Sequence, residues 1–157
     1  MKPSDLLALL REVYQDRLGL MADHRASAER VGRYQFNNTY QYIIAREETQ
    51  LQWIADAIVT LGGTIPEDRA TELASDSEAQ VIAADLEKER AFVERWRPRV
   101  AAMTHARHRK MLDVVLGESL EHVRFFVEAA AGHLDLLGRS DTGAGERGTV
   151  LASRWLE

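Results

Sequence analysis

The sequence predicts an all-α fold in which four long helices pack together as a bundle. Apolar residues recur at spacings of three and four through four long segments, which is the period of a helix with one buried face. Prolines occur only at positions 3, 66 and 98, so long stretches run without a helix breaker. The alternation of apolar and polar residues that marks strands is nearly absent.

The first two helices are bounded by ordinary start and stop signals. Ser4 or Asp5 can cap the first helix, which we expect to end near residue 27. The second helix is expected over residues 31–61. The pair Gly62-Gly63 then predicts a stop, because glycine readily adopts the left-handed conformation that ends helices.

The third helix follows an unusually long connection. Residues 62–75 make a link of about fourteen residues, whereas neighbouring helices are usually joined by two to eight. This length predicts a crossover along the bundle. The third helix is expected to begin at Asp76 or Ser77, since Ser77 and Gln80 match a capping box. Pro98 is expected to end or kink it.

The fourth helix is expected over residues 104–137, with Gly138 as its stop. The chain is thus predicted to have a four-helix bundle over residues 1–138 and a C-terminal extension over residues 139–157. The extension is rich in turn residues but includes the apolar segment 150–156. We expect that segment to pack on the bundle or on a neighbouring subunit, which makes a homo-oligomer plausible.

Composition excludes several classes of function. The net charge of −5 argues against a protein that binds nucleic acid by neutralising phosphates. The absence of cysteine excludes disulfides, thiolate metal sites and cysteine nucleophiles. No apolar run is long enough to span a membrane, and the N-terminal segment does not resemble a secretory signal. A cytoplasmic protein that binds neither nucleic acid nor membrane is therefore expected.

Two helices carry carboxylates on faces that are otherwise apolar. Glu47 and Gln50 interrupt one such face, and Glu118 and His122 interrupt another. A buried carboxylate costs several kcal/mol unless it is paired or bound to a metal. These groups therefore need a partner inside the bundle, which could be a pair of divalent metal ions, an arginine or a shared proton.

The segment 42–66 resembles the ferritin-like superfamily, which includes bacterioferritins, rubrerythrins and miniferritins. It contains Glu47-x-x-Gln50, then an amphipathic run, Leu61-Gly62-Gly63 and Pro66, where the family pattern is Glu-x-x-His, amphipathic run, Leu-Gly-Gly and proline. The one departure is Gln50, which takes the place of the histidine. The resemblance implies a four-helix bundle that holds two iron or manganese ions per chain.

The resemblance also implies roles for particular residues. Glu47 and Glu118 would be bridging carboxylates, and either Glu121 or His122 would complete the second motif. One carboxylate from each of the first and third helices would finish the site, with Glu12 and Glu89 as candidates. The predicted metal ligands are therefore Glu12, Glu47, Gln50, Glu89, Glu118, Glu121 and His122.

Two functions of different classes remain open. If the metal site works, the resemblance implies oxidase or ferroxidase chemistry. Gln50 would weaken iron binding in one half-site, and the carboxylate-rich remainder would favour manganese or another hard cation over iron. The alternative is a bundle without metal that acts as a binding or structural module, with Arg46, Arg90 or Arg95 pairing the buried carboxylates. A pocket for a small molecule, lined by tyrosine and tryptophan, is a third possibility.

The remaining histidines and the basic stretch 105–110 are expected to be solvated. These histidines are His24, His105, His108 and His133.

Overall fold

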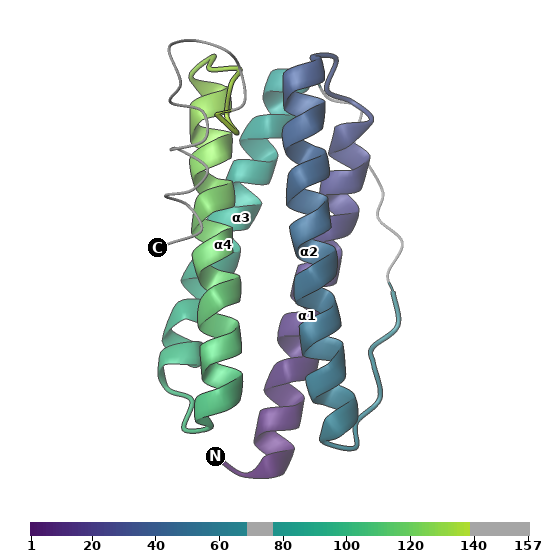
Figure 1. Cartoon of the computed structure of the whole chain (residues 1–157), viewed down its shortest axis with the longest axis vertical. Coiled ribbons are helices and arrows are strands. Elements are labelled where there is room, and N and C mark those ends of the chain that lie inside the picture. The colour runs from purple at the N-terminus through teal and green to yellow at the C-terminus, as the bar shows by residue number, and fades with distance from the viewer. Residues whose placement is uncertain (69–76, 139–157) are drawn as a thin grey trace.

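The computed structural model describes residues 1–68 and 77–138, and within these ranges the chain forms four α-helices and no strand. The helices are α1 (Pro3–Ala28), α2 (Tyr34–Thr60), α3 (Glu78–Ala101) and α4 (Ala106–Ala130). They lie side by side along one long axis (Figure 1). The predicted all-α fold and the four-helix bundle are confirmed.

Contacts near the helix ends fix the directions of the helices. The Arg33 backbone N–H donates to the Glu78 carboxylate at 3.1 Å, so α2 and α3 begin at the same end of the bundle. Glu12, near the start of α1, accepts from Arg99 near the end of α3, so these two helices are antiparallel. The end of α2 and the start of α3 therefore lie at opposite ends of the bundle. Residues 69–76 of the link between them lie outside the described ranges.

Most helix boundaries follow the expected signals. Ser77 caps α3 through the predicted capping box with Gln80, and Gly62 follows α2 with a φ of 78°. α1 is the exception at its start, because Lys2 is its N-cap and offers no side-chain cap. Pro98 does not end α3, which continues to Ala101.

α4 is shorter than the sequence predicts. It ends at Ala130 instead of residue 137, because Gly132 adopts a φ of 90° that no helix can accommodate. Leu136 and Leu137 lie beyond this turn and are still buried, so their apolar character reflects packing outside the helix. The predicted packing of residues 150–156 lies outside the described residues.

The core consists of two apolar layers along the bundle axis. One layer includes Leu10, Ile58 and Trp96, and the other includes Tyr40, Ile43 and Phe125. On each helix, at least one buried polar residue lies between the segments that contribute to these two layers. Within the described ranges, none of the helices combines the length and apolarity that a membrane span requires.

Candidate functional site

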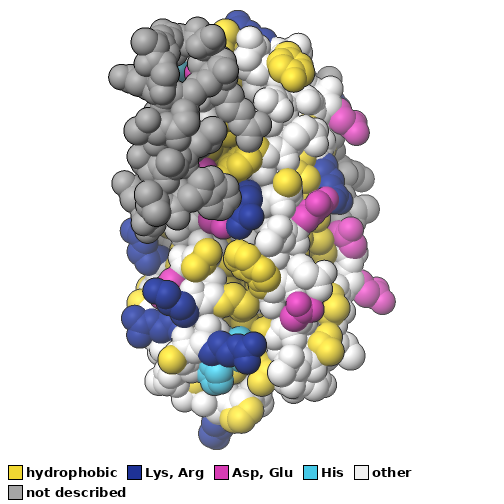
Figure 2. All heavy atoms as spheres, in the orientation of Figure 1, with side chains coloured by type: hydrophobic (Ala, Val, Ile, Leu, Met, Phe, Trp, Pro, Cys, Tyr) yellow, Lys and Arg dark blue, Asp and Glu magenta, His cyan; other side chains and the backbone are white. Residues whose placement is uncertain are grey.

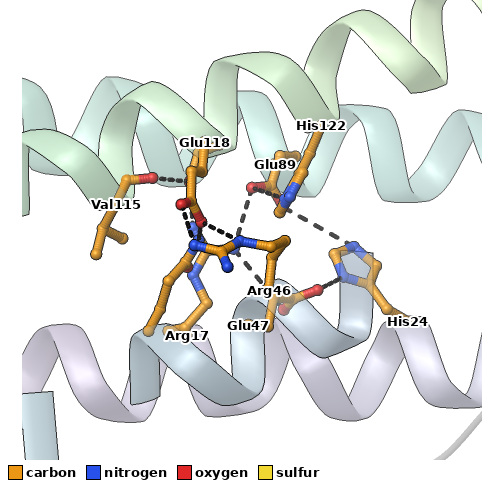
Figure 3. A network of polar contacts seen from close by, with 10 residues as sticks. Arg17, His24, Arg46, Glu47, Glu89, Val115, Glu118 and His122 are labelled. Atoms are coloured by element: carbon orange, nitrogen blue, oxygen red, sulfur yellow. Dashed lines mark hydrogen bonds and ion pairs between the residues drawn. The ribbon is translucent and has the colours of Figure 1, made fainter. Parts of the chain in front are cut away.

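A cluster of polar side chains lies between the two apolar layers, and all four helices contribute to it. Each of these side chains is at most 1% exposed. We call this set the buried polar cluster; its members are Arg17, His24, Glu47, Gln50, Asp85, Glu89, Ser119 and His122. Figure 3 shows most of its ionisable members facing one another across the bundle.

Arg17 of α1 joins the two glutamates of the cluster. Its Nη1 donates to Glu89 Oε1 at 3.1 Å and lies 3.7 Å from Glu47 Oε2. Its Nη2 donates to the Ser119 hydroxyl on α4. The guanidinium also lies 4.1 Å from the centre of the Phe92 ring. Arg17 therefore contacts every other helix of the bundle, and it supplies a fixed positive charge at the centre.

Two histidines complete the ionic network (Figure 3). His24 Nδ1 lies 2.5 Å from Glu47 Oε1, and its Nε2 lies 3.9 Å from Glu89 Oε2. His122 Nδ1 lies 3.5 Å from Glu89 Oε1. Glu47 and Glu89 thus each face Arg17 and at least one imidazole.

Asp85 and Glu118 occupy the edges of this network. The Tyr40 hydroxyl donates to Asp85 Oδ2 at 2.5 Å, which satisfies that buried carboxyl from α2. Glu118 is about one-quarter exposed, and it accepts hydrogen bonds from Arg46 and from Gln50 Nε2, the latter at 2.5 Å. Glu118 is therefore paired at the surface of the bundle and does not enter the cluster.

The pKa values of the cluster reflect these contacts. Burial by itself lowers the pKa of His24, but the adjacent Glu47 together with Glu89 and Asp85 outweighs burial and raises it to about 9. Burial raises the pKa of Glu89, and this is outweighed by the charge of Arg17 and by His122 and His24, so the net shift is downward. Burial also raises the pKa of Asp85. Arg17 and His24 thus place positive charge beside Glu47 and Glu89, while Asp85 is paired with the Tyr40 hydroxyl.

The hydrogen bonds of the buried polar cluster are incomplete. Within the described residues, every buried side-chain nitrogen or oxygen without a hydrogen-bond partner belongs to this cluster. These atoms are Arg17 Nε, His24 Nε2, Glu47 Oε2, Gln50 Oε1, Glu89 Oε2 and both ring nitrogens of His122. Buried polar atoms almost always have a partner, so buried water or an ion is expected to reach them.

The cluster has an internal symmetry in the sequence. Arg17 and Glu89 are 72 residues apart, and the same separation relates Glu47 to Ser119 and Gln50 to His122. Each pair joins a residue of α1 or α2 to one of α3 or α4. The two helix pairs therefore place matching positions at the centre, although the residues at those positions differ.

The structure brings together four of the predicted metal ligands and leaves three outside. Glu47, Gln50, Glu89 and His122 lie in the buried polar cluster. Glu12 is more than one-third exposed and pairs with Arg95 and Arg99. Glu118 pairs with Arg46 and Gln50. Glu121 accepts from the Tyr42 hydroxyl at 3.3 Å.

Arg17, His24, Asp85 and Ser119 belong to the cluster but were not among the predicted site residues. The expectation that His24 and His108 are solvated is wrong, since they are 0% and 7% exposed. His105 and His133 are exposed as expected. A signal was present for His24, because it continues the helical stripe of Leu10, Val13 and Met21.

Comparison with known proteins gives no match. No protein-family model fits the chain, and neither a curated protein nor a solved structure is significantly similar to it. The class of protein is therefore described from the structure alone: it is a four-helix bundle with a buried cluster of charged and polar residues at its centre.

The shifted pKa values predict how stability depends on pH. The folded pKa of His24, about 9, exceeds its ordinary value of 6.5, so its contribution is complete below pH 6.5 and is lost as pH rises towards 9. This loss should be on the order of 3 kcal/mol. Glu89 acts in the opposite direction, because its lowered pKa gives stability above about pH 4.5 that is lost as pH falls.

Denaturant unfolding between pH 4 and pH 9.5 measures this profile. We expect the free energy of unfolding to be highest between about pH 4.5 and 6.5. His24→Gln should flatten the decline from pH 6.5 to 9. An equally steep decline in that variant would assign the pH dependence to other groups.

Proposed function

We propose that this chain is a ferritin-like bundle without a resident metal, in which Arg17 takes the place of the metal cation. In this proposal the bundle is a cytoplasmic binding or structural module that works as a homo-oligomer. The supporting observation is the position of Arg17, whose Nη1 lies 3.1 Å from Glu89 and 3.7 Å from Glu47. These are the two buried glutamates that would otherwise ligate a metal.

The residues of the cluster fit a dimetal centre poorly. Two ions in such a bundle are held by about four carboxylates and two histidines. Here Glu12, Glu118 and Glu121 are engaged elsewhere, and Arg17 adds a positive charge that repels cations. In the part of the chain that the structure describes, no group of three or more His, Cys, Asp or Glu residues is arranged to hold a metal ion.

The ferritin-like architecture belongs to the same proposal. The parallel arrangement of α2 and α3 supports a crossover that runs along the bundle between them. The 72-residue repeat of the cluster positions supports two helix pairs related by a pseudo-twofold axis. We extend this to a bundle domain at residues 1–138 with a C-terminal extension at residues 139–157.

Metal content tests the proposal directly. The protein is purified without chelator, and bound metal is measured by elemental analysis before and after anaerobic loading with ferrous or manganous ion. We expect close to zero metal per chain in every case. Glu12→Gln serves as a control, because Glu12 lies outside the cluster and its change should have no effect.

A second candidate function is supported by the unpartnered atoms of the cluster. His24, Glu47, Glu89 and His122 each leave a buried ligand atom without a hydrogen bond, and these residue types bind iron and manganese. If Arg17 moves aside, they could hold metal and support oxidase or ferroxidase chemistry. One to two ions per chain, lost in Glu47→Ala and Glu89→Ala, would establish this candidate and overturn the metal-free proposal.

A further inference from the structure

A cavity lies between α2 and α4, near the end of α2 and the start of α4. Its volume is about 600 Å³, which is within the range of pockets that hold small organic molecules. Its apolar lining residues are Trp53, Ala57, Leu61, Met111 and Val114. Figure 2 shows hydrophobic side chains gathered between the two helices in the lower half of the view, with histidine and basic side chains below them.

The polar lining of this cavity is mainly basic. Asp56 and Thr60 come from α2, while the α4 side contributes His105, Arg107, His108 and Lys110. Arg107 and Lys110 are both exposed, and neither forms an ion pair with another described residue. Their charges are therefore available to a bound anion.

Two histidines line the cavity beside these basic residues. Nδ1 of His105 lies 2.9 Å from Nδ1 of His108, and the ring centroids are 4.3 Å apart. Burial lowers the pKa of His108, and the neighbouring His105 and Arg107 lower it further. A negative charge nearby would relieve this crowding of positive groups.

We propose that this cavity binds a small anionic amphipathic molecule. Its apolar body would lie against Trp53, Met111 and Val114, and its acidic head would face Arg107 and Lys110. Pockets for such ligands combine an apolar lining with a few convergent polar groups. The cavity is distinct from the buried polar cluster, so this proposal holds whether or not the cluster binds metal.

Two dyes that differ by one charged group test the proposal. The probes are 1-anilinonaphthalene-8-sulfonate and its neutral parent, N-phenyl-1-naphthylamine. We expect the sulfonate to bind the full chain at least about tenfold more tightly than the neutral dye, because a charge-assisted contact adds about that much. Equal affinity for the two dyes would overturn the proposal.

Charge reversal locates the head group. Arg107→Glu with Lys110→Glu should weaken sulfonate binding by at least about tenfold and leave the neutral dye unchanged. The matched control is Arg97→Glu with Arg109→Glu, which makes the same change in net charge at exposed positions outside the cavity. An equal loss of binding in the control would reduce the effect to overall charge and overturn the proposal.

A second pair of variants locates the apolar body. Val114 and Val127 both lie on α4 and are 42% and 41% exposed, so an aspartate at either position is compatible with folding. Val114→Asp should abolish sulfonate binding, whereas Val127→Asp should not.

Sedimentation of the unliganded protein completes the test. A dimer that Val114→Asp converts to monomer would show that a second copy of the chain covers this surface, which would overturn the proposal.

Discussion

Replacing Arg17 with methionine is expected to lower the free energy of unfolding by about 3–5 kcal/mol. Methionine preserves much of the packing of the arginine side chain but removes its charge. The buried carboxyl groups of Glu47 and Glu89 would remain, and only the imidazoles of His24 and His122 would be left to compensate their charge. Removing one partner of a buried ion pair is costly because the remaining charge stays desolvated.

Urea denaturation followed by circular dichroism measures this loss. Arg95→Met is the matched control, since Arg95 forms ion pairs with Glu12 and Asp16 but is about half exposed. Its loss should cost no more than about 1 kcal/mol, as is usual for surface pairs. Similar stability of the two variants would contradict a central role for Arg17.

The neutralised cluster gives a second expectation. Arg17→Met combined with Glu47→Gln and Glu89→Gln should recover most of the lost stability, because neither glutamate position then carries a charge that lacks its arginine partner. No recovery would mean that Arg17 stabilises the bundle through packing against Phe92 and its hydrogen bond to Ser119.

The helices could be predicted from the sequence because their signals are local. The apolar stripe of each helix, the glycine stop after α2 and the capping box at Ser77 all depend on residues within a few positions of one another. The burial of Glu47 and Gln50 was also predictable, because both interrupt an apolar stripe.

Which residues meet in the buried polar cluster depends on how the four helices are aligned along the bundle. Local sequence signals do not show this alignment. Arg17 continues the stripe of Leu10, Val13 and Met21, yet an arginine at such a position is usually solvated. Glu118, predicted to be a bridging carboxylate together with Glu47, lies one position before Ser119, the residue that is 72 positions from Glu47. One residue turns a helical side chain by about 100°, which is why Ser119 faces the core and Glu118 the surface.

The separation of 72 residues leads to a prediction with a large effect. Among the six symmetry-related central positions, Glu47, Glu89 and His122 carry strong metal ligands, Gln50 offers only a weak amide oxygen, and Arg17 and Ser119 are not part of the usual ligand set. A dimetal bundle uses a glutamate from two helices and a Glu-x-x-His pair from each of the other two. The triple variant Arg17→Glu, Gln50→His and Ser119→Glu supplies that set at the matching positions.

We expect this triple variant to bind about two divalent ions per chain, against close to none in the parent. Without metal it should be markedly less stable than the parent, since four buried glutamates would repel one another. Manganous ion should restore its stability, because a ligand that binds only the folded state stabilises that state. Elemental analysis and thermal unfolding with and without metal measure both effects.

The double variant Arg17→Glu with Gln50→His is the control for register. It keeps Ser119 and relies on the native Glu118, which lies one position away and is held by Arg46. If the separation of 72 residues defines the site, this double variant should bind clearly less metal than the triple variant. Equal metal content in the two would show that Glu118 can turn inward, and would favour Glu118 over position 119 as the partner of Glu47.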